Sequence, residues 1–216
     1  MSDETITFTV RSADVSDLDA VMAVEADWPE QQRAPREKFE SRLERFPEGF
    51  LVVEADGGIV AVCTSTLVTY DPGDLGPFRS WESCTNNGYL HPLGDRSAYN
   101  AYYIVSQGIR KAYRREGIRE GMIRANFDVT AKLGLDYTVT GAMMPGYDRF
   151  CRENGEIPAR EYAFLRRHGE LVDPTLRKLA TLGLTLPDER HVIEGFYISP
   201  ESRNYGALLV HRTSHI

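Results

Sequence analysis

The chain has 216 residues, 42% of them hydrophobic and 26% charged, and its net charge at pH 7 is −7. These fractions exclude a disordered or fibrous chain, and the acidic balance disfavours a general nucleic-acid binder, which needs basic residues to neutralise phosphates. The length suits one domain whose core needs no disulfides, so we treat residues 1–216 as a single domain.

Residues 6–47 predict a strand followed by two helices. Apolar residues alternate from Ile6 to Val10, which is typical of a strand. Ser16 is a suitable N-cap for a first helix that runs to Glu25. A second helix is expected from Pro35 to Phe46, with an apolar stripe formed by residues 39, 43 and 46.

A hairpin and a long loop follow. Residues 50–54 and 59–69 are rich in β-formers and flank Asp56-Gly57-Gly58, which predicts a hairpin. Residues 71–97 contain many glycines and prolines but also several aromatic residues. We therefore expect a long loop that packs against the domain, and loops of this length are more often functional than idle.

The second half of the chain alternates strands and helices. The expected elements are a strand over 98–109, a helix over 118–134, a strand over 135–139, a partly helical insertion over 145–172, a helix opened by Asp173-Pro174, and strands over 191–197 and 205–210. No internal repeat is present in the sequence, and the order of elements predicts one mixed α/β domain.

The turn between the strand at 98–109 and the following helix concentrates positive charge. Arg114, Arg115 and Arg119 surround Gly117 at the expected start of the helix. Free N–H groups and the positive dipole end make a helix start an anion site, and glycine lets a diphosphate approach closely. The sequence contains neither a GxxxxGK[ST] nor a GxGxxG motif, which disfavours a nucleoside triphosphatase or a dinucleotide dehydrogenase. A solvated basic turn is the alternative interpretation.

The segment Arg114-Arg115-Glu116-Gly117-Ile118-Arg119 resembles the acetyl-coenzyme A loop of the GNAT superfamily of N-acetyltransferases, whose signature is Arg/Gln-x-x-Gly-x-Gly/Ala. The order of elements agrees with that family along the chain. Residues 142–147 and 200–206 are similar, more narrowly, to bacterial members found alone or fused to carbon–nitrogen hydrolases. The resemblance implies an α/β (α+β) fold with a central mixed, mostly antiparallel sheet of about seven strands, flanked by helices.

The resemblance also implies acetyl-CoA as co-substrate and a set of residues that binds it. These residues are Ile109, Arg110, Lys111, Arg114, Arg115, Glu116, Gly117, Ile118 and Arg119. The backbone N–H groups of Ile109 and Lys111 would serve the pantetheine arm and the acyl oxygen. Arg119 stands where the signature has glycine or alanine, which changes the approach of the phosphates there.

The catalytic groups depart from the family pattern. Tyr103 stands where family members often carry a carboxylate base, and a neutral tyrosine is a poor base at neutral pH. We favour a packed strand aromatic for Tyr103 and keep Glu82, in the long loop, as a rival base. Leu179 stands where the family's tyrosine acid is expected, so Tyr147 is the candidate acid, with a packed tyrosine as its alternative interpretation.

The resulting hypothesis is an N-acetyltransferase that moves an acetyl group from acetyl-CoA to a small-molecule amine by direct attack. The alternative is a non-catalytic acyl-CoA-binding sensor or accessory module. We expect neither nucleic acid nor membrane as a partner, and the sequence leaves a homodimer open.

The three cysteines predict a reduced chain. Cys63, Cys84 and Cys151 are odd in number and form no CxxC pair, and no histidine lies at metal-ligand spacing from them. We therefore expect no disulfide framework and no zinc or other metal site, and we expect Cys151 to be a buried structural cysteine rather than a nucleophile. Acidic residues stand near the N-terminus where a secretion signal has basic ones, and no apolar run approaches a membrane span, so we expect a cytoplasmic protein.

Overall fold

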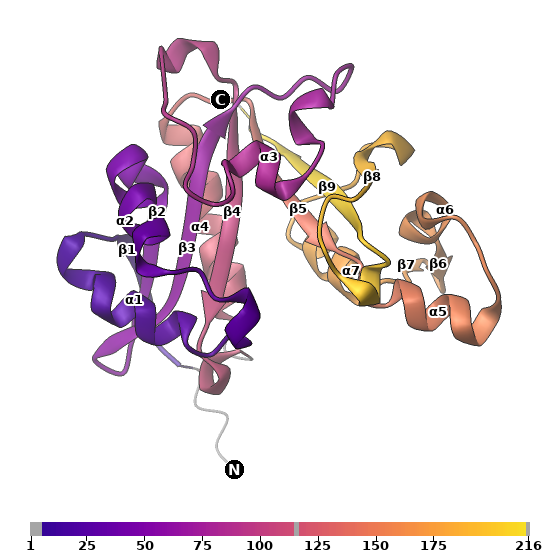
Figure 1. Ribbon diagram of the computed structural model, residues 1–216, viewed down its shortest axis with the longest axis horizontal. Coiled ribbons are helices and arrows are strands. Elements are labelled where there is room, and N and C mark those ends of the chain that lie inside the picture. The colour runs from indigo at the N-terminus through magenta and orange to yellow at the C-terminus, as the bar shows by residue number, and fades with distance from the viewer. Residues whose placement is uncertain (1–5, 115–116, 215–216) are drawn as a thin grey trace.

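A seven-stranded sheet with the order β1-β2-β3-β4-β5-β9-β8 is the centre of the computed structural model, which describes residues 6–114 and 117–214 (Figure 1). Its strands are β1 (Thr9–Ser12), β2 (Phe50–Ala55), β3 (Gly58–Val68), β4 (Ala101–Ile109), β5 (Tyr137–Met143), β8 (Val192–Glu194) and β9 (Tyr205–Arg212). Neighbouring strands are antiparallel except β4 and β5, which are parallel. The predicted mixed, mostly antiparallel sheet is confirmed.

Helices cover the sheet, and a small two-stranded hairpin lies apart from it. The α-helices are α1 (Leu18–Glu25), α2 (Arg36–Arg45), α3 (Trp81–Thr85), α4 (Ile118–Lys132), α5 (Tyr147–Asn154), α6 (Ala159–Phe164) and α7 (Pro174–Thr181). Short 3₁₀ helices are η1 (Val15–Asp17), η2 (Glu30–Gln32), η3 (Pro47–Gly49), η4 (Gly76–Phe78), η5 (Arg96–Ala98), η6 (Lys111–Tyr113), η7 (Glu189–His191) and η8 (Pro200–Ser202). The hairpin pairs β6 (Arg166–Arg167) with β7 (Glu170–Leu171).

Two successive residues of β3 show how the layers are arranged. Val62 is buried in an apolar cluster with α1 and α2. The thiol of Cys63 instead lies against the amide of Asn126 in α4, with the Asn126 Nδ2 donating to Sγ at 3.3 Å. Because successive side chains of a strand point to opposite faces, α1 and α2 cover one face of the sheet and α4 covers the other.

Local sequence signals place most element boundaries within a few residues. The first strand begins at Thr9 rather than Ile6. Asp14, not Ser16, is the capping residue here, and it caps η1, the 3₁₀ helix that leads into α1: its carboxylate accepts a hydrogen bond from the Ser16 N–H at 2.7 Å. The predicted cap at Asp173 is confirmed, since its Oδ1 accepts from the N–H groups of Thr175 and Leu176.

The insertion between β5 and α7 is joined to the domain through a buried carboxylate. Asp173 is 1% exposed, and besides capping α7 it accepts hydrogen bonds at Oδ2 from the Gly146 N–H (3.3 Å) and the Tyr162 hydroxyl (3.2 Å). Tyr162 lies on α6, so one side chain connects the end of β5, α6 and the start of α7. In Figure 1, α5, α6 and the β6–β7 hairpin lie together on the side of the molecule opposite α1 and α2.

Cys63, Cys84 and Cys151 are buried and free. Within residues 6–114 and 117–214, no helix has the length and apolar character needed to cross a bilayer.

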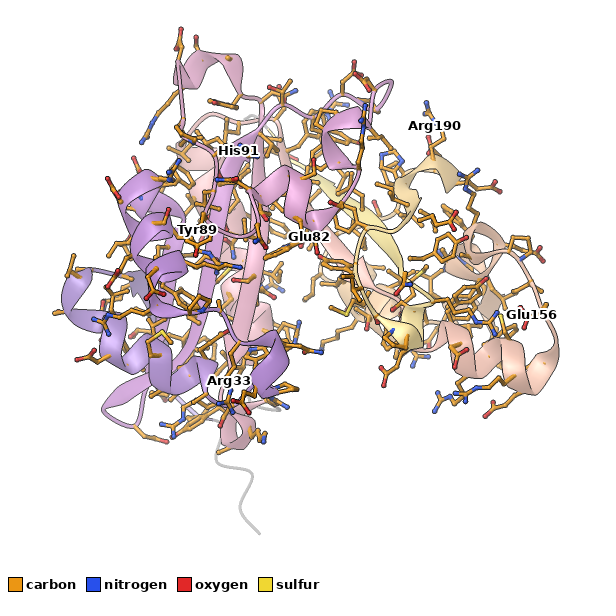
Figure 2. All side chains as sticks on the ribbon, viewed as in Figure 1. Arg33, Glu82, Tyr89, His91, Glu156 and Arg190 are labelled. Carbon is orange, nitrogen blue, oxygen red and sulfur yellow. The ribbon has the colours of Figure 1, made fainter. Side chains whose placement is uncertain are left out.

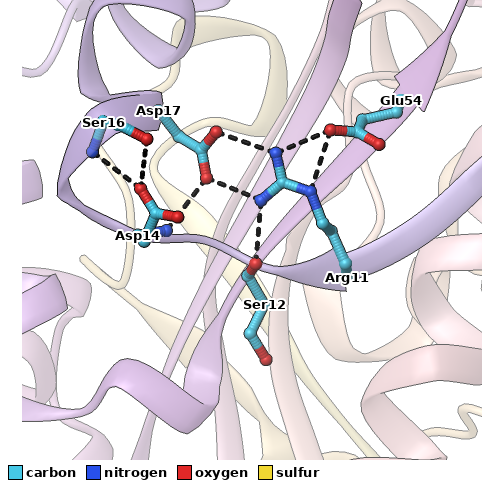
Figure 3. Close-up of polar contacts among 6 residues, drawn as sticks. All are labelled: Arg11, Ser12, Asp14, Ser16, Asp17 and Glu54. Atoms are coloured by element: carbon cyan, nitrogen blue, oxygen red, sulfur yellow. Dashed lines mark hydrogen bonds and ion pairs between the residues drawn. The ribbon is translucent and has the colours of Figure 1, made fainter.

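An ion network fastens β1 to its neighbours (Figure 3). The Arg11 guanidinium donates to both oxygens of Asp17, at 2.6 and 2.8 Å, and to Glu54 Oε1 from two of its nitrogens. Asp17 is 8% exposed, and its hydrogen bonds with Arg11 lower its pKa below the ordinary value. The bidentate geometry joins the first strand, η1 and β2 through one side chain.

We expect Asp17→Asn to destabilise the fold at pH 7 by about 1–3 kcal/mol, because it removes hydrogen bonds between charged groups. A lowered folded-state pKa contributes stability that is present above the unfolded pKa and lost as the pH falls through the folded one. The difference between wild type and Asp17→Asn, measured by urea unfolding, should therefore shrink between pH 7 and pH 3. An equal difference at both pH values would contradict this role for the carboxylate.

Candidate functional site

The sheet opens where β4 and β5 separate. The two strands are paired from Ala101 opposite Tyr137 to Ile104 opposite Thr140. Beyond that point β4 continues along β3 only, and β5 continues along β9 only. A wedge therefore opens toward the carboxyl ends of both strands, and in Figure 1 it divides the molecule into two halves.

A β-bulge lies at the point of separation. Ile104 is opposite Ser65 and Ser106 is opposite Thr64, so Val105 is an extra residue in β4. The Val105 carbonyl accepts a hydrogen bond at 3.0 Å from the indole Nε1 of Trp81, the first residue of α3. The long loop that the sequence predicts thus reaches the bulge through an aromatic side chain.

Beyond the bulge, β4 presents to the wedge backbone groups that β5 no longer pairs. The Arg110 N–H donates to the Val60 carbonyl of β3 at 2.9 Å. In an antiparallel pair, every second residue of a strand bonds to the partner strand and the residues between them point their backbone groups away from it. Gln107 and Ile109 therefore direct their N–H and C=O groups away from β3, where β5 no longer follows. The predicted N–H of Ile109 is among them, whereas the N–H of Lys111 donates to the Asp27 carboxylate at 2.7 Å.

A cavity of about 590 Å³ lies beside this edge. It is lined by Ala26, Asp27, Trp28, Pro29, Gln32, Arg33, Gln107, Ile109, Lys111, Arg114 and Arg119. Four of these residues are cations, drawn from the α1–α2 connection, the turn after β4 and the start of α4. Arg110 is exposed and does not line the cavity.

The start of α4 forms one wall of the site. Gly117 has φ +72°, a left-handed conformation that favours glycine, and a Cβ added there would meet no atom within 4 Å. Ile118 is 1% exposed and anchors the first turn in the core, while the Arg114 Nε donates to the Ile109 carbonyl at 3.3 Å. The predicted residues Arg115 and Glu116 lie outside the described part of the chain.

The three predicted catalytic residues lie in different environments. Glu82 is exposed on α3, next to Trp81, and in Figure 2 it lies above Arg33 on the face turned to the viewer. Tyr103 is fully buried, its hydroxyl makes no hydrogen bond of ordinary geometry within residues 6–114 and 117–214, and burial raises its pKa well above the ordinary value, helped by nearby Tyr197 and Cys84. This environment is that of the packed aromatic that we favoured.

Tyr147 belongs to the insertion. It begins α5, and its hydroxyl donates to the Ile157 carbonyl at 2.8 Å. Burial raises its pKa to about 12. Its ring packs against those of Tyr162 and Tyr205, so Tyr147 contacts neighbours in the insertion and β9.

A tyrosine that sequence reasoning missed lies closer to the wedge. Gly141 is the first residue of β5 beyond the paired segment, and a Cβ added there would lie 2.5 Å from the Tyr197 hydroxyl oxygen. This hydroxyl therefore lies over the backbone of β5 at the separation. Trp28, Arg33 and Gln107 were also missed, and the only signal was a polar Gln107 within an apolar strand.

Comparisons with known proteins agree on the fold. No family model matches the chain. It is 29% identical over 181 residues to the probable hydrolase YhcX of Bacillus subtilis, covering 82% of this chain and 33% of YhcX. It is 24% identical over 209 residues to the uncharacterized N-acetyltransferase YkwB of the same organism, covering 93% of this chain and 87% of YkwB. The chain thus spans about a third of one of these relatives and most of the other.

Two solved structures are similar over nearly the whole chain. The loading GNATL domain of CurA from Lyngbya majuscula has a TM-score of 0.78 at 19% identity, covering 97% of this chain and all of that domain. The GNAT-like decarboxylase GphF, in complex with isobutyryl-CoA, has a TM-score of 0.76 at 22% identity, covering 95% of this chain and all of that structure. The chain therefore has the GNAT fold, and the resemblance to that superfamily seen in residues 114–119 is confirmed at the level of the fold.

Proposed function

We propose that this protein is an N-acetyltransferase that moves the acetyl group of acetyl-CoA to a small-molecule amine by direct attack. The observation that carries the proposal is the cavity beside β4, where four cations meet the strand edge that β5 has left; two of them, Arg114 and Arg119, flank Gly117 in the chain. YkwB, similar along most of this chain, is named as an N-acetyltransferase, and GphF was solved with an acyl-CoA.

The residues present fit a coenzyme A thioester. Arg33, Lys111, Arg114 and Arg119 supply the positive charge that a diphosphate requires, and Gly117 leaves space at the helix start. The backbone groups of Gln107 and Ile109 suit an amide-bearing arm that lies along β4 as a strand would. Bound there, acetyl-CoA supplies an activated acyl carbonyl.

Glu82 is our proposed base. It is a carboxylate on α3, next to Trp81, whose indole contacts the bulge. A carboxylate there takes the proton that the amine loses as it attacks, which tyrosine cannot do at neutral pH. Tyr103 has no access to this proton because it is fully buried.

Tyr197 is our proposed hydrogen-bond donor to the reacting carbonyl. Burial raises its pKa, so the hydroxyl remains protonated and donates throughout the reaction. Tyr147 is the alternative donor, predicted from the sequence. Its bond to Ile157 counts against it, because the Tyr147 hydroxyl already donates its hydrogen bond to that carbonyl.

The paired variants Tyr197→Phe and Tyr147→Phe distinguish the two donors. We expect Tyr197→Phe to lower kcat about 100-fold, the typical cost of one preorganised donor, and Tyr147→Phe to change it less than about threefold. Steady-state kinetics measure both, and thermal unfolding controls for damage to the fold. The opposite ranking would assign the role to Tyr147.

The function itself is tested by incubating the protein with acetyl-CoA and a panel of amines while free thiol is followed. We expect thiol release that depends on one class of amine, with the acetylated amine identified by mass spectrometry. Tight binding of acetyl-CoA without turnover of any amine would overturn the proposal. It would favour the second candidate, a non-catalytic acyl-CoA-binding module, which is supported by the burial of Tyr103 and by Leu179 at the position expected for the acid.

A further inference from the structure

Arg42 is a buried cation that the proposed reaction does not use. It lies on α2, and the residue is 2% exposed. Its Nε donates to the Gly88 carbonyl at 2.7 Å, and its Nη1 donates to the hydroxyls of Thr64 at 3.2 Å and Ser106 at 3.0 Å. All three acceptors are neutral, so these contacts satisfy hydrogen bonds without balancing the charge.

Within the described residues, Arg42 takes part in none of the ion pairs that the structure forms. Glu25 is the carboxylate whose charge influences Arg42, but it accepts its hydrogen bond from the Ala34 N–H. Burial lowers the pKa of Arg42 to about 10, which still leaves it charged at neutral pH. Glu25, which is 7% exposed, therefore offsets part of this charge from a distance, and within the described residues no carboxylate is bonded directly to the guanidinium.

Arg42 adjoins the bulge of β4. Ser106, which shares a hydrogen bond with it, follows Val105 directly and is half-buried. Gly88 packs between Arg42 and Trp81, because a Cβ there would lie 2.8 Å from the Arg42 Nη2 and 2.9 Å from the Trp81 ring. Arg42 and Trp81 therefore flank the place where β4 and β5 separate.

The Nη2 atom of Arg42 is the part of the guanidinium that is available to bind a ligand. Of the five N–H donors of a guanidinium, the hydrogen bonds above use one on Nε and those of Nη1. Within the described residues Nη2 donates no hydrogen bond, and this atom is not one of the fully buried polar atoms that lack a partner. Two donors on one nitrogen thus remain directed to space that solvent reaches.

A second cation strengthens the positive potential. Lys38 lies one turn earlier on α2, and burial together with the charge of Arg42 lowers its pKa. Its Nζ is 3.4 Å from Asn87 Oδ1, and Glu82 is the carboxylate that acts on it. The corner between α2 and α3 therefore has two cations on one side and the proposed base on the other.

We propose that Arg42 binds a carboxylate carried by one of the two reactants and holds it next to the bulge of β4. The proposal deepens the proposed function and rests on its placement of the reactants. One source of the carboxylate is the acceptor, which would then be an amino acid with its ammonium group toward Glu82. The other is an acyl-CoA whose acyl chain ends in a carboxylate. In both, Nη2 and the Ser106 hydroxyl donate to the anion.

Calorimetry of the full chain tests both sources without relying on turnover. In one arm the protein is titrated with malonyl-CoA and with acetyl-CoA. In the other, protein saturated with coenzyme A is titrated with the common L-amino acids and with their carboxamides. We expect the carboxylate ligand to bind about 10- to 100-fold more tightly than its neutral partner in one arm, which identifies the source.

The variants assign that preference to Arg42. Arg42→Gln keeps a donor for the Gly88 carbonyl, and Thr64 and Ser106 still bond each other at 2.8 Å, so the fold has partners for its polar groups. We expect this variant to lose the preference, Arg42→Lys to retain part of it, and the control Arg45→Gln on the same helix to retain it fully. Coenzyme A affinity should be unchanged in all three.

No preference for a carboxylate in either arm of the wild-type titrations would overturn the proposal, as would a preference that survives in folded Arg42→Gln. Binding with the expected preference but without turnover would leave the carboxylate site standing and remove only the proposed transferase function. Turnover of neutral amines with acetyl-CoA, without any carboxylate preference, would overturn the carboxylate site and leave the proposed transferase function standing.

Discussion

Gly117→Glu is expected to lower the affinity for acetyl-CoA at least about 100-fold while the chain still folds. The substitution places a negative charge at the start of α4, where the proposed diphosphate would meet Arg114 and Arg119, and it opposes the positive helix dipole. A Cβ added at this position meets no atom of the described residues within 4 Å, so the expected cost to the fold is that of the left-handed conformation, about 1 kcal/mol.

Gly117→Asn is the matched control, because asparagine tolerates the left-handed conformation and adds no charge. We expect a much smaller loss of affinity for this variant than for Gly117→Glu, with similar urea unfolding for both. Calorimetric titration with acetyl-CoA measures the difference. Unchanged affinity in Gly117→Glu would refute the assignment of the cavity to coenzyme A.

Glu82→Gln is expected to lower kcat about 100- to 1,000-fold, the usual contribution of a positioned general base. The variant keeps the size and polarity of the side chain, and Glu82 is exposed, so the fold has no reason to change. The KM for acetyl-CoA should stay unchanged, because Glu82 does not line the cavity that contains the four cations.

Two comparison variants make the result specific. Glu44→Gln removes another exposed carboxylate, on α2, and should leave kcat unchanged. Tyr103→Phe removes a buried hydroxyl that makes no hydrogen bond of ordinary geometry within the described residues, so the fold should tolerate it and kcat should fall far less than in Glu82→Gln. If Tyr103→Phe rather than Glu82→Gln abolished turnover, the base would have to be sought on β4.

The sequence predicts the parts of this molecule that depend on local patterns. Alternation, caps and glycine turns locate the strands and helices, and the cluster of arginines around Gly117 marks one wall of the cavity. These signals are local because each arises from residues that are only a few positions apart in the sequence. The bulge at Val105 has no such signal, since it depends on how β3 and β4 are aligned.

The remaining site residues are brought together by tertiary packing. Tyr197 reaches the wedge from the β8–β9 connection, and Trp28 and Arg33 reach the cavity from the α1–α2 connection. Arg42 is the instructive case. The periodicity predicts a core stripe of residues 39, 43 and 46, whereas the structure buries Phe39, Arg42 and Phe46, with the cation in the middle. The position of Arg42 between two apolar residues of this stripe was the sequence signal that this cation is buried.

The separation of β4 from β5 also bears on solubility. Past Ile104, β4 presents the kind of unpaired strand edge that attracts another chain and promotes aggregation. An acyl-CoA whose pantetheine lies against Gln107 and Ile109 would act as a surrogate strand that caps this edge. If an acyl-CoA binds there, it should slow amide exchange at these two residues and suppress self-association of the protein.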